Sequence, residues 1–182
     1  MEELGRLEDL PLEYRQELLK QNLVPLEISW GIKGDYNSEP IQTSKGSIGV
    51  CICYDLNDPK VCMSLKKKGA DYIVAPSGSC TGFIRSYYPH MLEHSKESNK
   101  GNQIVQRAFE FSEFLVDVLK VQLSNTQFPH KVTYHDACGA LRECGIKAQP
   151  RTLLNQIKGM ELVEMKECET CCGFGGTFAI KY

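Results

Sequence analysis

Short β-rich runs alternate with helix-like stretches along the first half of the chain. The run GSIGVCICYD (46–55) and the run ADYIVAP (70–76) are rich in strand-forming residues. Between them, DPKVCMSLKKKG (58–69) offers Asp58 as a helix N-cap, a proline at the first helical position and Gly69 as a stop signal. The order strand, helix, strand predicts one β-α-β unit.

The second half of the chain repeats this alternation. In NQIVQRAFEFSEFLVDVLK (102–120) the apolar residues fall at helical spacing, which predicts one long amphipathic helix capped by Asn102, with its phenylalanines in the core. After it, KVTYHD (131–136) is typical of a strand, QPRTLLNQIKG (149–159) of a helix and MELVEM (160–165) of a strand. The whole pattern predicts an α/β fold with a mainly parallel sheet, in which ligand groups gather beyond the carboxyl ends of the strands.

Composition and charge limit the classes of protein to which the chain can belong and its cellular compartment. The chain has 182 residues, 42% of them hydrophobic, and a net charge of -2. The run Lys66 to Lys68 is best read as the solvated end of a helix, so the sequence predicts no nucleic-acid surface. No apolar run approaches the roughly 18 residues of a membrane span. The acidic start MEELGRLEDL differs from a secretory signal, so we expect a cytoplasmic protein.

Nine cysteines are unusual for such a chain. In a reducing compartment they favour a metal-binding or catalytic role over a disulfide framework. Cys138 follows the strand KVTYHD, and the adjacent pair Cys171 and Cys172 follows MELVEM. Two neighbouring parallel strands would deliver these three thiols to one edge of the sheet, which predicts a metal site there. Thiolates suit zinc or iron-sulfur clusters, and the glycines after the pair would let backbone amides approach the sulfurs.

The residues alone leave the metal open. Cys168 and Cys171 form a C-x-x-C pair, so Cys138, Cys168, Cys171 and Cys172 are also a candidate tetrahedral zinc site. Cys51 and Cys62 lie in apolar surroundings, where a thiol usually acts as a small buried hydrophobe, and we assign them no role.

The spacing of YHDAC, thirty-two residues and then CCGFGG resembles the cysteine-rich CCG motif found in heterodisulfide reductases, glycolate oxidase iron-sulfur subunits and the lactate-utilisation protein A family. Residues 69–182 are similar to the last of these families throughout. The resemblance implies that Cys138, Cys171 and Cys172 are iron-sulfur ligands of a second repeat and that Cys80, in PSGSC, is the closing ligand of a first repeat. It also implies a cluster of 4Fe-4S type and other subunits of a lactate-utilisation complex as partners.

The chain departs from that family in three places. No cysteine lies about thirty-five residues before Cys80, where the first repeat should offer ligands, and the closing cysteine of the second repeat would lie beyond Tyr182. Gly139 stands where the family usually has histidine. We therefore expect an incomplete iron-sulfur subunit.

The beginning of the chain resembles a different family. KQNLVPLE, followed by ICYDLNDPKVCMSLKKKGADYIVAPS, is similar to the nitrilase and apolipoprotein N-acyltransferase superfamily. That resemblance implies that Cys53 is a nucleophile and Lys20 a catalytic lysine, because a thiolate is activated by a neighbouring cation and base. The general-base glutamate of the family has no counterpart upstream of Lys20.

The segments that resemble the two families thus join near residues 69–77. We expect a nitrilase-like α/β fragment in residues 1–76 and a partial CCG cysteine-rich domain in residues 77–182. The function predicted first is an iron-sulfur electron-transfer subunit acting in L-lactate oxidation. The alternatives are a carbon-nitrogen hydrolase or N-acyltransferase fragment that uses Cys53, and a structural zinc-binding module.

Overall fold

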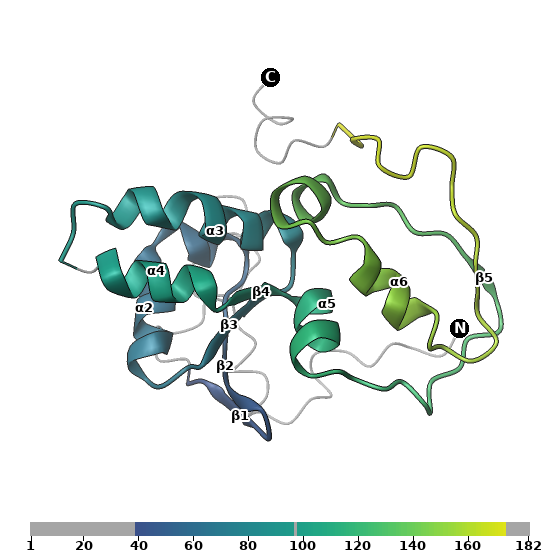
Figure 1. The fold of residues 1–182 in the computed structure, drawn as a ribbon, viewed down its shortest axis with the longest axis horizontal. Helices are drawn as coiled ribbons and strands as arrows, with labels where there is room; N and C mark the ends of the chain where they lie inside the picture. The colour runs from purple at the N-terminus through teal and green to yellow at the C-terminus, as the bar shows by residue number, and fades with distance from the viewer. Residues whose placement is uncertain (1–38, 97, 174–182) are drawn as a thin grey trace, which may run out of the picture.

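The computed structural model describes residues 39–96 and 98–173 and contains a four-stranded sheet (Figure 1). The strands lie in the order β1-β2-β3-β4 and span Ile41–Thr43, Gly46–Val50, Tyr72–Ala75 and Ala108–Glu110. β1 pairs antiparallel with β2, while β2, β3 and β4 pair in parallel. The predicted α/β fold with a mainly parallel sheet is confirmed.

The predicted β-α-β unit is present between β2 and β3. A 3-10 helical turn, η3, covers Cys53–Asn57, and helix α2 covers Pro59–Lys67. The Asp58 carboxylate accepts a hydrogen bond from the Lys60 backbone N–H at 3.0 Å, which is N-capping as predicted. Gly69 takes a φ of +97°, a left-handed conformation that favours glycine just after a helix.

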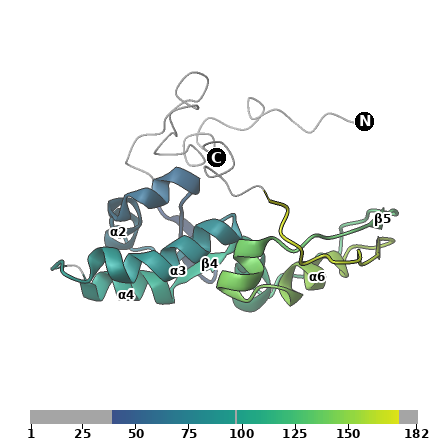
Figure 2. The ribbon, with the colours of Figure 1, turned by 90° about the horizontal axis from the view of Figure 1, so that it is seen from above.

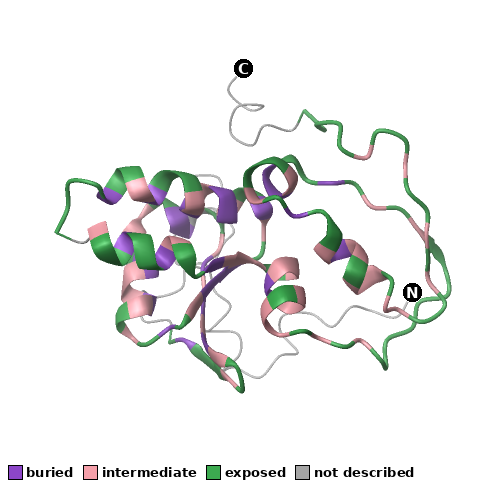
Figure 3. Cartoon of the chain, viewed as in Figure 1, coloured by how far each residue is buried: buried purple, intermediate pink, exposed green. Residues whose placement is uncertain are grey.

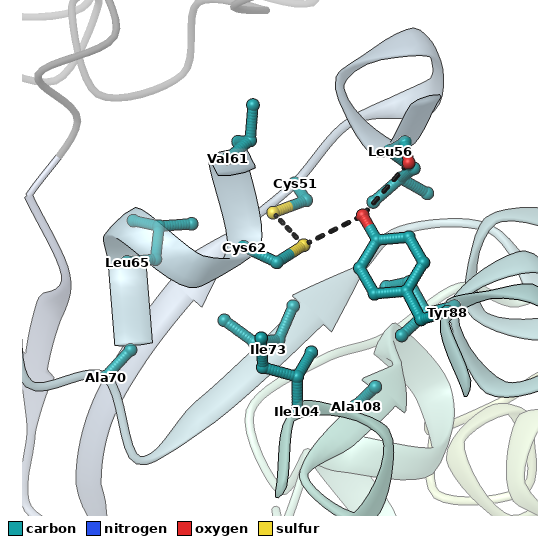
Figure 4. Close-up of a cluster of buried hydrophobic side chains, with 11 residues drawn as sticks. Cys51, Leu56, Val61, Cys62, Leu65, Ala70, Ile73, Tyr88, Ile104 and Ala108 are labelled. Atoms are coloured by element: carbon teal, nitrogen blue, oxygen red, sulfur yellow. Dashed lines mark hydrogen bonds between the residues drawn. The ribbon is translucent and has the colours of Figure 1, made fainter. Parts of the chain in front are cut away.

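Helices α3 (Gly78–Leu92) and α4 (Ser98–Gln106) run side by side and connect β3 to β4 (Figures 1 and 2). The main core lies where these helices and α2 meet the sheet (Figures 3 and 4). Buried residues from both sides of position 76 share this core, among them Cys51, Leu56, Cys62, Ile73, Ile84, Tyr88, Ile104 and Ala108. The segments on both sides of residue 76 therefore share one core.

The prediction of one long helix over residues 102–120 is wrong. Helix α4 begins earlier, so Asn102 lies inside it, and strand β4 follows at once. After β4 come the short helix α5 (Phe111–Glu113) and a π-helical turn, η4 (Phe114–Val118). The parallel pairing of β4 with β3 overrides the helical spacing, because it places Ala108 in the core as a strand residue.

The remaining elements form a smaller part that extends from one end of the sheet (Figure 2). Strands β5 (Lys131–Val132) and β6 (Glu161–Leu162) pair in parallel, with the π-helical turn η5 (Gly139–Glu143) and helix α6 (Ala148–Leu154) between them. The strands predicted here exist but are shorter than expected. Few residues of this part are buried (Figure 3), so polar contacts carry much of its structure.

Glycines allow the two parts to meet at very short range. A Cβ added to Gly78, at the start of α3, would lie 2.4 Å from the Ala140 backbone. A Cβ at Gly139 would lie 2.9 Å from the Ser79 Cα. The departure from the family at position 139 therefore coincides with a contact that leaves no room for a histidine side chain.

No helix within residues 39–96 and 98–173 has the length and apolar character needed to cross a membrane.

Candidate metal centre

Two loops that leave the same edge of the β5-β6 pair carry most of the predicted ligands. The first loop runs from the end of β5 to Cys138, and the second runs from the end of β6 through Cys168 to Cys172. The Asp136 backbone N–H donates to the Cys168 carbonyl at 2.9 Å. The His135 ring nitrogen Nε2 lies 2.8 Å from the Thr170 carbonyl oxygen. The parallel pairing of the strands thus continues as direct contact between the two cysteine-bearing loops.

A charge network centred on buried Asp136 joins these loops to α6. The Arg151 guanidinium donates from Nη1 and Nη2 to the two carboxylate oxygens of Asp136 at 2.7 and 2.8 Å. It also donates from Nε and Nη2 to Glu164, just beyond β6, at 2.6 and 3.0 Å. The Arg151 carbon Cζ lies 5.2 Å from the centre of the Tyr134 ring. One cation therefore contacts both loop segments.

The network shifts the acidity of its members. The hydrogen bonds from Arg151 hold the pKa of the Asp136 carboxyl below its ordinary value, although burial acts in the opposite direction. Desolvation and a hydrogen bond with Asp136 raise the pKa of the Cys168 thiol. Cys168 is therefore kept as a thiol more readily than an ordinary cysteine.

The second loop has an unusual backbone and an exposed sulfur. Glu167 has a φ of +55°, a left-handed conformation that is uncommon for a residue with a side chain. The Gly173 backbone N–H points to the Cys171 Sγ at a distance of 3.4 Å. A shallow depression of about 500 Å³ opens here, lined by Arg142, Glu167, Cys168, Glu169, Thr170 and Cys171.

The thiols fit a soft metal or an iron-sulfur cluster in their chemistry. Cys138, Cys171 and Cys172 are exposed and free, and a backbone amide already reaches one of the sulfurs. The loops do not gather the thiols, however: within residues 39–96 and 98–173, no group of three or more His, Cys, Asp or Glu side chains is arranged to hold a metal ion. The assignment of ligands therefore stays a prediction, and Gly175 and Gly176 lie outside the described residues.

Cys80, the fourth predicted ligand, comes from the larger part of the chain. It is half-buried in the first turn of α3, next to Ser79, which packs on Gly139. Burial raises the pKa of the Cys80 thiol, and hydrogen bonds from Ser77 and the Cys53 backbone counteract part of that rise. The fold thus brings the segments that carry Cys80 and Cys138 against each other.

The predicted nucleophile Cys53 opens the turn η3 after β2, and its backbone forms a hydrogen bond with the Cys80 thiol. It is exposed and has a φ of +52°, a strained backbone of the kind found at functional sites. Lys20, its predicted partner, lies outside the described residues. The thiols of Cys51 and Cys62 are buried and belong to the core as predicted (Figure 4), and their sulfurs lie 3.2 Å apart.

The sequence pattern gave no indication of Arg151 and Glu164 as parts of the candidate site. The stretch PRTLL marked Arg151 only as an early helix residue. One signal was available: Asp136 is a carboxylate next to a predicted ligand, and a buried carboxylate needs a cationic partner.

Comparison with known families agrees with this two-part arrangement. A family model described as a cysteine-rich domain, CCG, matches residues 132–182, and a family model for carbon-nitrogen hydrolases matches residues 7–109. The chain therefore belongs to the carbon-nitrogen hydrolase family through residues 7–109, more than half of its length, and residues 132–182 are similar to the CCG cysteine-rich domain.

Individual relatives show a further similarity. The chain is 41% identical over 115 residues to lactate utilization protein A of Oceanobacillus iheyensis, covering 63% of this chain and 47% of that protein. It is also 41% identical over 113 residues to lactate utilization protein A of Geobacillus kaustophilus, covering 62% of this chain and 47% of that protein. The chain thus spans about half the length of these relatives. No solved structure matches it.

Proposed function

We propose that the chain acts as an iron-sulfur electron-transfer subunit in lactate utilisation, together with other subunits of an L-lactate-oxidising complex. Cys138, Cys171 and Cys172 are the proposed ligands, and Cys80 is the candidate for the fourth. The identity to lactate utilization proteins A supports the pathway, and the CCG domain supports the cofactor class. The complex itself and the completeness of the subunit belong to the proposal.

One observation carries the proposal: the loop that ends at Cys138 is hydrogen-bonded to the loop that contains Cys168, Cys171 and Cys172. In the proposed centre, the exposed thiols of these two loops come together when the metal binds. The contact between Gly139 and Ser79 adds Cys80 to the same neighbourhood.

A bound cluster of 4Fe-4S type would supply one-electron oxidation and reduction. The residues of the chain would bind and tune it. Exposed Cys138, Cys171 and Cys172 offer sulfur ligands that a cluster can reach from solvent. The Gly173 amide near the Cys171 sulfur would stabilise negative charge on that ligand.

Anaerobic reconstitution of the full chain with iron and sulfide tests the proposal. Replacing Cys138, Cys171 or Cys172 by Ser should each lower bound iron and the broad absorption near 400 nm, because a hydroxyl is a hard ligand and replaces a soft thiolate poorly. Cys144→Ser is the matched control, since that thiol is half-buried near the Gly78 carbonyl oxygen, 3.5 Å away. Cys53→Ala should also leave the iron content unchanged.

Equal iron retention in the wild type and the three serine variants would refute these ligands. A colourless protein that retains zinc and loses it when Cys168 is replaced by Ser would favour the structural zinc module in place of an iron-sulfur centre.

A second function is favoured by the backbone at Cys53. An exposed cysteine with a φ of +52° at the end of a strand, in a chain that belongs to the carbon-nitrogen hydrolase family, is suited to nucleophilic attack on an amide or thioester. Iodoacetamide near neutral pH should then modify Cys53 before the buried Cys51 and Cys62, as read by peptide mass spectrometry. Equal labelling of the three thiols would argue against a selective nucleophile.

A further inference from the structure

The Arg151 side chain, on α6, contacts both cysteine-bearing loops. Its guanidinium binds Asp136 of the first loop through two hydrogen bonds and Glu164 of the second segment through two more. A further bond from Nη1 reaches the Lys147 carbonyl oxygen at 2.9 Å, which anchors the group to its own helix. Nη2 lies 3.9 Å from the Cys168 Sγ.

The burial of this pair makes it different from an ordinary surface ion pair. The Asp136 side chain is 1% exposed and that of Arg151 is 15% exposed. Such a carboxylate depends on its partner, because removing one member of a buried pair leaves an uncompensated charge. Only arginine offers the planar fork that binds two carboxylates side by side, so lysine at this position keeps the charge and loses the geometry.

Backbone hydrogen bonds and short chain segments connect the Arg151–Asp136 pair to the cysteines. Asp136, fixed by Arg151, donates its N–H to the Cys168 carbonyl, and it stands two positions before Cys138. The tight turn from Glu167 to Thr170, closed by a 2.9 Å backbone hydrogen bond, then leads into the Cys171-Cys172 pair. The guanidinium therefore contacts both ligand-bearing segments and is not itself a predicted ligand.

We propose that Arg151 is a positioning residue that keeps the Cys138 loop and the Cys168–Cys172 loop in contact, so that their thiols can move together onto one thiophilic metal ion when it binds. The inference rests on the proposed function for its biological meaning, but its test does not need iron. Without the hydrogen bonds of Arg151 to Asp136 and Glu164, the two loops separate and their thiols act as independent, weak ligands.

Hydrogen exchange of the metal-free full chain provides the first measurement. Arg151→Met and Arg151→Lys should raise the exchange rates of amides in residues 134–138 and 167–173, while amides in β2 and β3 keep their wild-type rates. Lys131→Met is the matched control, because Lys131 also contributes a cation between β5 and β6, through Glu161 at 3.4 Å, but both side chains are largely exposed. This control should exchange as the wild type does.

Titration with Cd²⁺ alone, followed by its thiolate absorption band, provides the second measurement. Loss of a residue that orients metal ligands typically weakens metal affinity about 10- to 100-fold. We expect a weakening in that range for Arg151→Met and Arg151→Lys, and unchanged affinity for Lys131→Met. Far-UV circular dichroism confirms that each variant is folded, and Arg151→Lys serves as the test if Arg151→Met is not.

The outcomes separate this inference from the proposed function. Wild-type exchange rates and Cd²⁺ affinity in a folded Arg151→Lys variant would overturn the inference, whatever the iron content. A wild type that binds Cd²⁺ but takes up no iron on reconstitution would overturn the iron-sulfur function and leave the role of Arg151 standing. A wild type that binds neither would overturn both.

Discussion

The Tyr88 hydroxyl joins helix α3 to the segment that links β2 and α2. Tyr88 lies on α3, beyond residue 76, and is fully buried. Its hydroxyl donates to the Leu56 carbonyl oxygen at 2.9 Å and lies 3.4 Å from the Cys62 Sγ (Figure 4). Desolvation, and the proximity of Cys62, raise the pKa of Tyr88 well above its ordinary value, so the hydroxyl stays protonated as a donor.

Replacing Tyr88 by Phe removes this hydroxyl and keeps the ring. The Leu56 carbonyl then loses its donor in a buried position, which costs about 1–3 kcal/mol of the free energy of unfolding. For a chain of this size, each 1 kcal/mol lowers the melting temperature by roughly 2–4 °C. A loss of about 2 kcal/mol therefore corresponds to roughly 4–8 °C.

Urea unfolding and thermal melting, both followed by circular dichroism, measure the change. Tyr87→Phe is the matched control, because the neighbouring hydroxyl belongs to a side chain that is 56% exposed, and its loss should alter the free energy of unfolding by less than about 0.5 kcal/mol. Equal stabilities of the two variants would refute the reasoning. That result would mean that α3 does not pack on the β2-α2 segment as the structure shows.

Two further predictions concern the junction and the thiols. Gly78→Ala should lower the free energy of unfolding by about 1–3 kcal/mol, because its Cβ would lie 2.4 Å from the Ala140 backbone, which must move; urea unfolding as stable as the wild type would contradict this contact. The hydrogen bond with Cys62, together with burial, raises the pKa of the Cys51 thiol. Its alkylation by iodoacetamide should therefore appear only well above the pH at which exposed Cys53 reacts, and modification of both at neutral pH would contradict the burial.

Local signals were sufficient for the elements whose boundaries are set by nearby residues. Asp58 and Gly69 mark the two ends of α2 correctly, since capping and left-handed backbone depend on a few adjacent positions. The alternation of strands and helices likewise predicted parallel pairing, both between β2 and β3 and between β5 and β6. The cysteine spacing predicted the family of residues 132–182.

Long-range pairing decided what local signals predicted wrongly. The apolar spacing of residues 102–120 favours one helix, yet Ala108–Glu110 forms a strand, because its hydrogen bonds complete the edge of β3. No pattern within that stretch reports the presence of a partner strand more than thirty residues away in the sequence.

The candidate site divides in the same way. The sequence determined which thiols are available, that the predicted ligands Cys138, Cys171 and Cys172 lie in the stretch that matches the CCG domain, and that an acidic residue stands two positions before Cys138. Only the tertiary structure decided that Arg151 binds that acidic residue and Glu164 together, and that Gly139 packs against the segment of Cys80. The sequence shows where the cysteines stand along the chain. Their arrangement in space depends on hydrogen bonds and close contacts between segments that are distant in sequence.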